Sequence, residues 1–312
     1  MKHINRIDLV KSSILLIFCG LFIVSCNKDF GHRALVDYAG TATTQFVAAG
    51  ETKIAYRVLG NKGGIPLVMI SALGNSMDDW DPAVTNGLAQ QYKVIIFDIK
   101  GVGSSNGSTP DNIEDMADGV VDFIHDLGYS KVNLLGFSMG SFIGQRIALK
   151  DPDLVNRIIL TGTGPKGAIG LANLPNILAG AVGLTPEEVF LVSFFASSAE
   201  SQDAGKLSYE RIQARTVNRD APVSQASFGA ELTAVLGWAQ PDPGALHELK
   251  SITKPVLIAQ GEKDLLVPVV NAINMSDSIR GARLIVFPDA GHGAIFQYHD
   301  AFVAAAIQFL GR

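Results

Sequence analysis

The chain has 312 residues, 47% of them hydrophobic, and a formal net charge of −5, with 25 Lys and Arg against 30 Asp and Glu. This length is enough to bury one large core, or one core and an insertion. The sequence contains no run of basic residues, no low-complexity tract and no internal repeat, so we expect no nucleic-acid partner and no array of repeated units.

The first 26 residues resemble a bacterial lipoprotein signal. Three basic residues precede an apolar run over 14–24, which is short for a membrane span and ends directly before Ser25-Cys26. In such signals the cysteine is lipidated and becomes the mature N-terminus, so we expect lipidation at Cys26. Cys19 fits less well because the bulky Phe18 precedes it. An uncleaved signal anchor and conventional secretion are the alternatives.

Cleavage before Cys26 would set both the domain organisation and the location. Residues 1–25 would be the signal peptide, and 26–43 a tether to a membrane of the bacterial cell envelope, with the folded domain facing the periplasm or the exterior. The mature chain would carry 22 Lys and Arg against 29 Asp and Glu, a net charge of −7. Its one cysteine would be lipidated, which leaves no thiol for a disulfide, for catalysis or for a metal site.

Alternating strand and helix patterns follow. Residues 44–47 and 54–58 predict a hairpin around the turn residues 49–52. Continuous apolar runs then predict strands that are covered on both faces. These runs are 67–70, 94–97, 132–135, 158–160, 256–259 and 284–287. Helical patterns between and after them cover 113–127, 141–149 and 301–310. The alternation predicts an α/β fold with a mostly parallel, doubly covered sheet.

Between residues 164 and 246 only helical patterns occur. Thr185-Pro186-Glu187-Glu188 predicts a helix start with a capping box and proline at the first helical position. Further helical patterns cover 201–217 and 224–238. Because a strand resumes after Pro255, residues 164–246 are predicted to form a helical cap, inserted into a core of residues 44–163 and 247–312.

Residues 132–140, Val-Asn-Leu-Leu-Gly-Phe-Ser-Met-Gly, carry the most specific chemical signal. A buried-strand run enters Gly136-x-Ser138-x-Gly140, and a helical pattern follows at once. Strand, tight turn and helix are the context of a nucleophile elbow, in which crowded backbones require small residues two before and two after the serine. The pentapeptide alone is weak, but this context favours Ser138 as a nucleophile over a simple turn residue.

A serine nucleophile needs a base, and the base needs an acid to orient it. After an elbow these residues follow in the order Ser, Asp, His, at the carboxyl ends of later strands. Asp264 and His292 occupy such positions and are predicted to be the acid and the base. Glu262 and Asp289 compete for the role of the acid. The alternatives are an aspartate that only stabilises its turn and a structural histidine.

Together these residues resemble the capped serine hydrolases of the α/β-hydrolase fold family, over residues 44 to 312. The loop Asp98-Ile99-Lys100-Gly101-Val102-Gly103-Ser104-Ser105 is similar to the family's Asp-x-Arg-Gly-x-Gly-x-Ser loop. It is not a dinucleotide-binding motif, because Asn106 occupies the third glycine position. The resemblance implies that Ser138 is the nucleophile, Asp264 the acid and His292 the base.

One departure concerns the loop after the strand 67–70. The family usually carries His-Gly there, whereas this chain has Ser71-Ala72-Leu73-Gly74. The resemblance implies that the backbone amides of Leu73 and Met139 form the oxyanion hole. Because a backbone donor does not depend on its side chain, the hole survives the departure, but this loop gives no guide to the substrate.

We expect hydrolysis of a carboxylic ester, lactone or thioester through an acyl-enzyme, without metal or organic cofactor. A cap rich in Leu, Val, Phe and Ala favours a small or medium apolar acyl substrate, unless that content only packs the cap. Cofactor-free haloperoxidases (perhydrolases), C–C hydrolases and aminopeptidases share the fold and triad and are alternatives. A binding protein on a hydrolase scaffold is the non-enzyme alternative. The oligomeric state is open.

Overall fold

The computed structural model describes residues 36–49 and 52–311. The chain divides into two units, residues 1–34 and 35–312, and the second unit contains every element described below. The signal-peptide prediction, with Cys19 and Cys26, lies outside the described residues. Within residues 36–49 and 52–311, no helix has the length and apolar character needed to cross a membrane.

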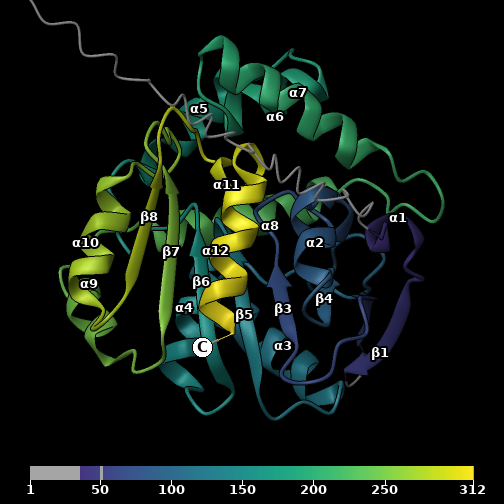
Figure 1. Ribbon diagram of the computed structural model, residues 1–312. Coiled ribbons are helices and arrows are strands. Elements are labelled where there is room, and N and C mark those ends of the chain that lie inside the picture. The colour runs from purple at the N-terminus through teal and green to yellow at the C-terminus, as the bar shows by residue number, and fades with distance from the viewer. Residues whose placement is uncertain (1–35, 50–51, 312) are drawn as a thin grey trace, which may run out of the picture. The chain divides into compact units, whose positions relative to one another are not determined.

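Eight strands of the described chain form one sheet in the order β1-β2-β4-β3-β5-β6-β7-β8 (Figure 1). The pairs β1–β2 and β2–β4 are antiparallel, and all other neighbours are parallel. The predicted mostly parallel sheet is therefore confirmed. The strands are β1 (Gln45–Ala49), β2 (Thr52–Leu59), β3 (Leu67–Ile70), β4 (Val94–Phe97), β5 (Val132–Phe137), β6 (Val155–Thr161), β7 (Val256–Gly261) and β8 (Arg283–Phe287).

Helices cover both faces of this sheet, which explains the continuous apolar runs. In β5, Leu134 packs into a core with the helices α3, α4 and α10, whereas Leu135 packs into a second core with α2, α11 and α12. Successive strand residues point to opposite faces, so both positions must be apolar. These helices are α2 (Pro82–Ala89), α3 (Ile113–Asp126), α4 (Met139–Lys150), α10 (Val270–Ser278), α11 (Ala294–Gln297) and α12 (His299–Leu310).

A helical insertion between β6 and β7 forms the predicted cap, and Figure 1 shows its helices α6 and α7 beyond the carboxyl ends of the strands. The capping box at Thr185 and Glu188 is confirmed. The last turn of α8 returns to the core, where Trp238 stacks on Phe142 with ring centroids 5.3 Å apart. The cap helices are η2 (Leu171–Asn173), α5 (Leu174–Gly180), α6 (Pro186–Phe194), α7 (Ala199–Gln213) and α8 (Gln225–Trp238), and α9 (Ala245–Glu248) and η3 (Leu249–Ser251) lead to β7.

The end of the predicted tether is docked on the domain. Residues 38–41 form the short helix α1 (Tyr38–Thr41), and the N–H of Ala39 donates to Oδ1 of Asn86 in α2 at 2.8 Å. Arg215, which follows α7, donates to the carbonyl oxygens of Ala39 and Ala42. These hydrogen bonds satisfy backbone groups of Ala39 and Ala42, near the end of the segment predicted to be a tether.

Candidate active site

The candidate site lies where the chain order in the sheet reverses. From β3 the chain continues to β4 on one side and later to β5 on the other side of β3. In open α/β sheets, such a reversal opens a crevice at the carboxyl ends of the two strands. The loop containing Leu73 follows β3, and Ser138 follows β5, so both predicted elements meet at this crevice.

Ser138 occupies the corner between β5 and α4 with a strained backbone. Its φ of 54° and ψ of −117° lie outside the regions that side-chain-bearing residues prefer. The N–H of Ser138 donates to the carbonyl oxygen of Thr161 at 2.9 Å, and the hydroxyl of Ser141 lies within hydrogen-bond distance of the carbonyl oxygens of Gly136 and Thr161, at 2.6 and 2.8 Å. These hydrogen bonds to β6 and within the turn hold the strained corner in place.

Gly140 explains why the elbow needs a glycine after the serine. A Cβ at this position would overlap the carbonyl oxygens of Ile70 and Ser71 in the neighbouring strand and loop. These are backbone atoms, which cannot rotate away as a flexible side chain can. The small residue therefore allows the start of α4 to approach the end of β3 closely.

Asp264 and His292 are brought together in a buried pair. Nδ1 of His292 lies 2.8 Å from Oδ2 of Asp264, and the two residues are 2% and 4% exposed. Oδ1 of Asp264 accepts the N–H groups of Leu266 and Val267 at 2.9 and 2.8 Å. Its Oδ2 also accepts Nε2 of Gln260 at 2.7 Å. The carboxylate is thus fixed by four hydrogen bonds and can orient the imidazole.

The two competing acids have other partners. Oε2 of Glu262 accepts the N–H of Asp289 at 3.2 Å, and its other oxygen lies 3.6 Å from Lys263 at the surface. Asp289 accepts the hydroxyl of Ser198, the N-cap residue of α7, at 2.5 Å. Asp289 therefore ties the loop that carries His292 to the cap. The structure joins only Asp264 to His292 among these three acids.

The imidazole of His292 is held between aromatic rings and has one nitrogen available. Its centroid is 5.1 Å from the ring of Phe137 and 5.8 Å from that of Phe194. Nε2 is buried and has no hydrogen-bond partner among the described residues. Ser138 and His292 line the same cavity. With Nδ1 occupied by Asp264, Nε2 is the nitrogen that can accept a proton there.

The loop after β3 presents a tight turn to the same cavity. The N–H of Asn75 donates to the carbonyl oxygen of Ala72 at 3.2 Å, and Gly74, with φ of 75°, takes the third position of this turn, where only glycine fits readily. The N–H groups of Leu73 and Met139 have no hydrogen-bond partner within the described chain. Leu73 lines the cavity, and the oxyanion role of Leu73 and Met139 stays a prediction.

Glu231, a buried acid in α8 that was not predicted as a site residue, contacts this turn. Its Oε2 accepts the N–H of Gly74 at 2.7 Å, and its Oε1 is unpartnered among the described residues. Burial raises the pKa of Glu231 to about 7. Neighbours of Glu231 on the same face of α8, Phe228 and Val235, line the cavity. Glu231 thus connects the cap to the turn that carries Leu73.

Asp98, in the loop after β4 that resembles a loop of the family, binds the segment that follows this turn. Oδ1 of Asp98 accepts the N–H of Met77 at 2.7 Å, and Oδ2 accepts the N–H of Ser104 at 3.0 Å. Met77 begins the short helix η1 (Met77–Asp79) just after the turn. Burial and the nearby Asp220 raise the pKa of Asp98 to about 7. Asp98 therefore has a structural role at the base of the site.

The cavity that contains Ser138 and His292 has a volume of about 460 Å³. Its walls are mainly apolar, and most of them come from the cap helices. Its polar lining residues are Asn75, Asp79, Ser138 and His292 from the core and Ser193, Tyr209 and Gln213 from the cap. The apolar lining residues include Leu171, Leu174, Leu178, Leu184, Val189, Phe190, Phe194, Ile212, Phe228 and Val235. An apolar cavity with a few convergent polar groups is typical of a small-molecule site.

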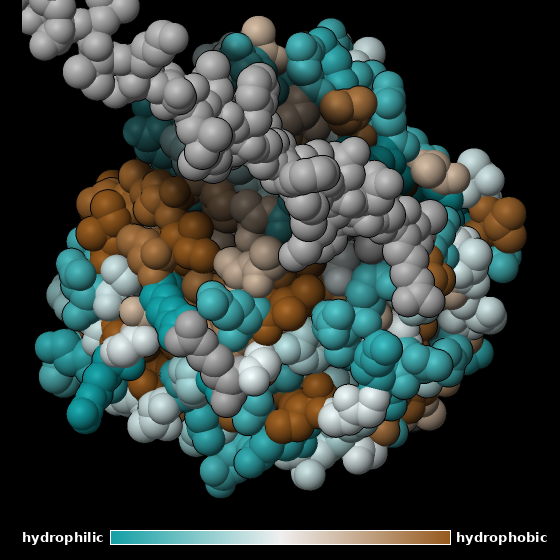
Figure 2. Space-filling view, in the orientation of Figure 1, coloured by the Kyte–Doolittle hydropathy of each residue, from teal (hydrophilic) through white to brown (hydrophobic). Residues whose placement is uncertain are grey.

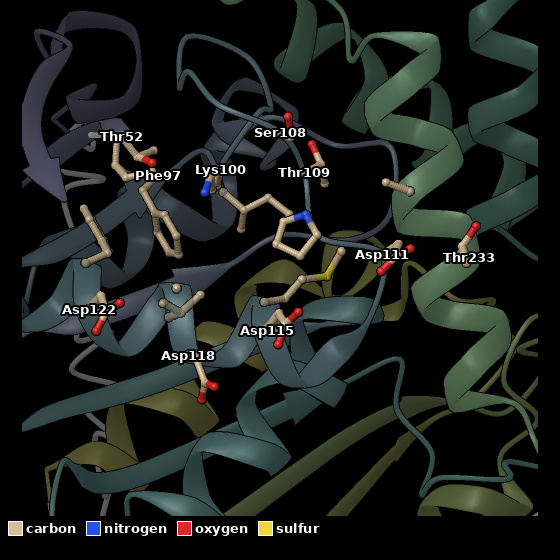
Figure 3. Close-up of a pocket in the computed structure, with 18 of the residues that line it drawn as sticks. Thr52, Phe97, Lys100, Ser108, Thr109, Asp111, Asp115, Asp118, Asp122 and Thr233 are labelled. Carbon is tan, nitrogen blue, oxygen red and sulfur yellow. The ribbon is translucent and has the colours of Figure 1, made fainter. Parts of the chain in front are cut away.

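A larger cavity, of about 770 Å³, lies elsewhere, against α3, α8 and the loop after β4. Figure 3 shows Asp115, Asp118 and Asp122 along α3, with Lys100 and Thr109 opposite. It contains none of the predicted site residues. No group of three or more His, Cys, Asp or Glu within residues 36–49 and 52–311 is placed to hold a metal ion.

Comparisons with known proteins agree with this geometry. Residues 65–297 match the α/β hydrolase fold family. An α/β hydrolase fold protein from Chitinophaga pinensis is 38% identical, with a TM-score of 0.85 over 87% of this chain and 98% of that chain. The pimeloyl-[acyl-carrier protein] methyl ester esterase of Nitrosomonas europaea is 24% identical over 77% of this chain and 94% of its own. The 2-hydroxy-6-oxo-6-(2'-aminophenyl)hexa-2,4-dienoic acid hydrolase of Metapseudomonas resinovorans is 27% identical over 86% and 91%.

The fold and the site define a capped α/β protein with a serine at a strained strand-to-helix corner. The chain belongs to the α/β-hydrolase fold family and is a hydrolase of this fold.

Proposed function

We propose that the protein hydrolyses a carboxylic ester, or a related lactone or thioester, through Ser138, His292 and Asp264. One observation carries the proposal: the strained Ser138 shares a cavity with a histidine whose Nδ1 is bonded to a buried carboxylate and whose Nε2 has no described partner. With the proton on Nδ1, Nε2 keeps the lone pair that a general base needs. The methyl ester esterase among the relatives supports the ester class.

In the proposed reaction, Nε2 of His292 takes the hydroxyl proton of Ser138 while Oγ attacks the carbonyl carbon. The tetrahedral intermediate carries its negative charge on the former carbonyl oxygen, which accepts the N–H groups of Leu73 and Met139. Collapse of the intermediate expels the alcohol, which receives the proton from His292, and leaves an ester on Ser138. A water molecule deprotonated by His292 then attacks this ester and releases the acid and Ser138.

The substrate that suits the cavity is a small or medium acyl compound with an apolar chain. The volume of about 460 Å³ and the Leu, Val and Phe lining favour such a group over a polar or bulky one. Leu265 is 73% exposed, and the next residues, Leu266 and Val267, line the cavity. In Figure 2 hydrophobic residues gather on the side of the molecule where α10 begins, a few residues after this loop.

The test is labelling with a fluorophosphonate, followed by a panel of activated ester, lactone, thioester, peptide and C–C bond substrates. Ser193 lines the same cavity from α6, so Ser193→Ala is the matched control. We expect Ser138→Ala to abolish both labelling and turnover, and Ser193→Ala to retain both. A wild-type protein that resists the label would favour a binding role instead. Labelling with turnover of peptides alone would keep the nucleophile and change the bond class.

The proposed location rests on the sequence alone. We propose that Cys26 is diacylated and anchors the domain to an envelope membrane, because a basic region and an apolar run precede it. One acyl chain binds a membrane weakly, whereas two or three give a stable anchor. The domain would then meet its substrates in the periplasm or at the cell surface.

A further inference from the structure

Two hydrogen bonds hold the end of the cap helix α6 against the loop that carries His292. The N–H of Gly293 donates to the carbonyl oxygen of Phe194, the last residue of α6, at 2.7 Å. The hydroxyl of Ser198, a few residues further on, donates to Asp289 at 2.5 Å. The cap is therefore bonded to this loop on both sides of His292, once shortly before it and once directly after it.

The glycines next to His292 allow this close contact. A Cβ at Gly291 would lie 2.6 Å from the carbonyl oxygen of Phe194, and a Cβ at Gly293 would lie 2.9 Å from the Cβ of Phe194. Both distances are too short for carbon atoms in contact, so a larger residue at either position would push the loop and the cap apart. Neither glycine has a positive φ, so the contact with the cap explains them better than the backbone conformation does.

The side chain of Phe194 also contacts the imidazole of His292. The two ring centroids are 5.8 Å apart and the ring planes are inclined by 26°, an arrangement in which aromatic rings attract each other. The ring of Phe137, in β5, lies 5.1 Å from the imidazole and 5.6 Å from the ring of Phe194. The imidazole therefore packs against one ring of the core and one ring of the cap.

This packing limits a rotation that the hydrogen bond to Asp264 alone leaves open. The torsion that turns an imidazole about its Cβ–Cγ bond has broad minima, so the direction of the ring depends on its contacts. Asp264 fixes the edge that carries Nδ1, at 2.8 Å, whereas Nε2 has no partner in the described chain. The contacts with Phe137 and Phe194 restrict how far Nε2 can turn.

We propose that Phe194 is a positioning residue for His292: its carbonyl oxygen holds the loop, and its ring holds the imidazole with Nε2 toward the hydroxyl of Ser138. This role rests on the proposed function, in which Nε2 must come within hydrogen-bond reach of that hydroxyl. A displacement of about 1 Å at a reacting group can lower a rate about 100-fold. The cap would then orient the general base as well as enclose the acyl chain.

Steady-state kinetics on a short activated ester tests this role. Phe194→Leu keeps the carbonyl oxygen and removes the ring, so we expect kcat to fall about tenfold or more and KM to change less. Phe194→Tyr keeps the ring and should restore most of kcat. Phe194 is half-buried, so both variants should fold, which circular dichroism checks.

Phe195→Leu is the matched control. Phe195 is 4% exposed, its ring packs on that of Phe190, and within the described chain it does not line the cavity. Because the removed ring is more deeply buried, Phe195→Leu should lower the free energy of unfolding at least as much as Phe194→Leu, and should leave kcat near that of wild type. Equal kcat in Phe194→Leu and wild type would overturn the proposal, as would equal losses of kcat in the two leucine variants.

A second measurement does not depend on turnover. The proton on Nδ1 of His292 can be followed by NMR without substrate, and its exchange with water reports how often the imidazole leaves Asp264. We expect faster exchange in Phe194→Leu than in wild type and in Phe195→Leu. Exchange at the wild-type rate in Phe194→Leu would overturn the positioning role. A wild-type protein that hydrolyses no substrate would contradict the proposed function instead, and the exchange rates would still decide whether Phe194 holds the imidazole.

Discussion

The backbone amide of Gly74 donates a hydrogen bond to the carboxylate of Glu231, 2.7 Å away and 157 residues further along the chain. Gly74 follows Leu73 in the turn proposed to hold the oxyanion, whereas Glu231 belongs to α8. Burial raises the pKa of this carboxyl to about 7, although the hydrogen bond from Gly74 lowers it. The turn is therefore held by a group that titrates near neutral pH.

The first prediction concerns the effect of Glu231 on stability. Its folded-state pKa lies above its ordinary value of 4.5, so the unfolded chain loses this proton at lower pH than the folded one. The free energy of unfolding must then fall as pH rises from 4.5 to about 7, and stay lowered above that. Between pH 5 and pH 8, wild type should lose about 2 kcal/mol more than Glu231→Gln in urea denaturation.

The same comparison carries its own controls. Asp98 also has a pKa raised to about 7, but it is present in both proteins. Its contribution therefore cancels in the difference in stability between wild type and Glu231→Gln. Glu187→Gln makes the same chemical change at an exposed position of α6 and should behave as wild type. If Glu231→Gln and wild type lose stability equally between the two pH values, Glu231 does not titrate in this range.

The second prediction distinguishes the acids. Asp264→Asn should leave the fold intact and lower kcat by about 10³–10⁴-fold, because the imidazole loses the carboxylate that fixes its orientation and tautomer. Glu262→Gln should change kcat little, since Glu262 lies at the surface beside Lys263. Steady-state kinetics on an activated ester, with circular dichroism as a check of folding, measures both. A larger loss in Glu262→Gln would show that the wrong carboxylate has been chosen.

The third prediction concerns Gly140. Gly140→Ala forces a Cβ against backbone oxygens of Ile70 and Ser71, and should lower the free energy of unfolding by about 2 kcal/mol or more. Gly119→Ala in α3 is the matched control, because nothing lies within 4 Å of the added Cβ. It should stabilise the protein by about 0.5–1 kcal/mol through helix propensity. Denaturant titration of the two variants measures both effects. If Gly140→Ala is as stable as wild type, the close approach of α4 to the end of β3 is not the reason for this glycine.

The fourth prediction concerns attachment. Protein extracted from bacterial membranes should have Cys26 as its first residue, with a diacylglycerol on Sγ. Cys26→Ser should prevent lipid modification of the precursor and change the cell fraction in which the protein is recovered. Mass spectrometry of the N-terminal peptide checks this. An intact Met1 peptide, or an unmodified Cys26 in the soluble fraction, would contradict the lipoprotein proposal.

The strands were predictable from the sequence because the sheet is covered on both faces. Strands β3 and β4 begin and end at the predicted residues, since every position in them is buried and must be apolar. The helix α2 was not predicted. Its capping Asp81 and first-turn Pro82 are typical helix signals, but Thr85 and Asn86 interrupt the apolar pattern in its interior.

The candidate site was predictable only in part. Ser138, Asp264 and His292 each follow a strand, so local sequence was enough to place them at the carboxyl ends of strands. Gln260 and Glu231 were missed because their importance depends on partners far away in the sequence. Gln260 joins Asp264 to the N–H of Thr163, and Glu231 joins Gly74 to the cap. Nothing in the residues around either position indicates those partners.

The proposed chemical groups and the apolar wall of the cavity come from different parts of the chain, which determines how the substrate range could be altered. The proposed chemical groups all come from core loops, while the cap provides most of the apolar wall. Hydrogen bonds described above link the two parts at the site, among them those from Gly74 to Glu231 and from Ser198 to Asp289. A cap exchanged from a relative would therefore alter which acyl chains fit. It would leave the chemistry intact as long as it supplied an acceptor at 231, a hydroxyl at 198, and at 194 the ring and carbonyl oxygen that contact His292 and Gly293.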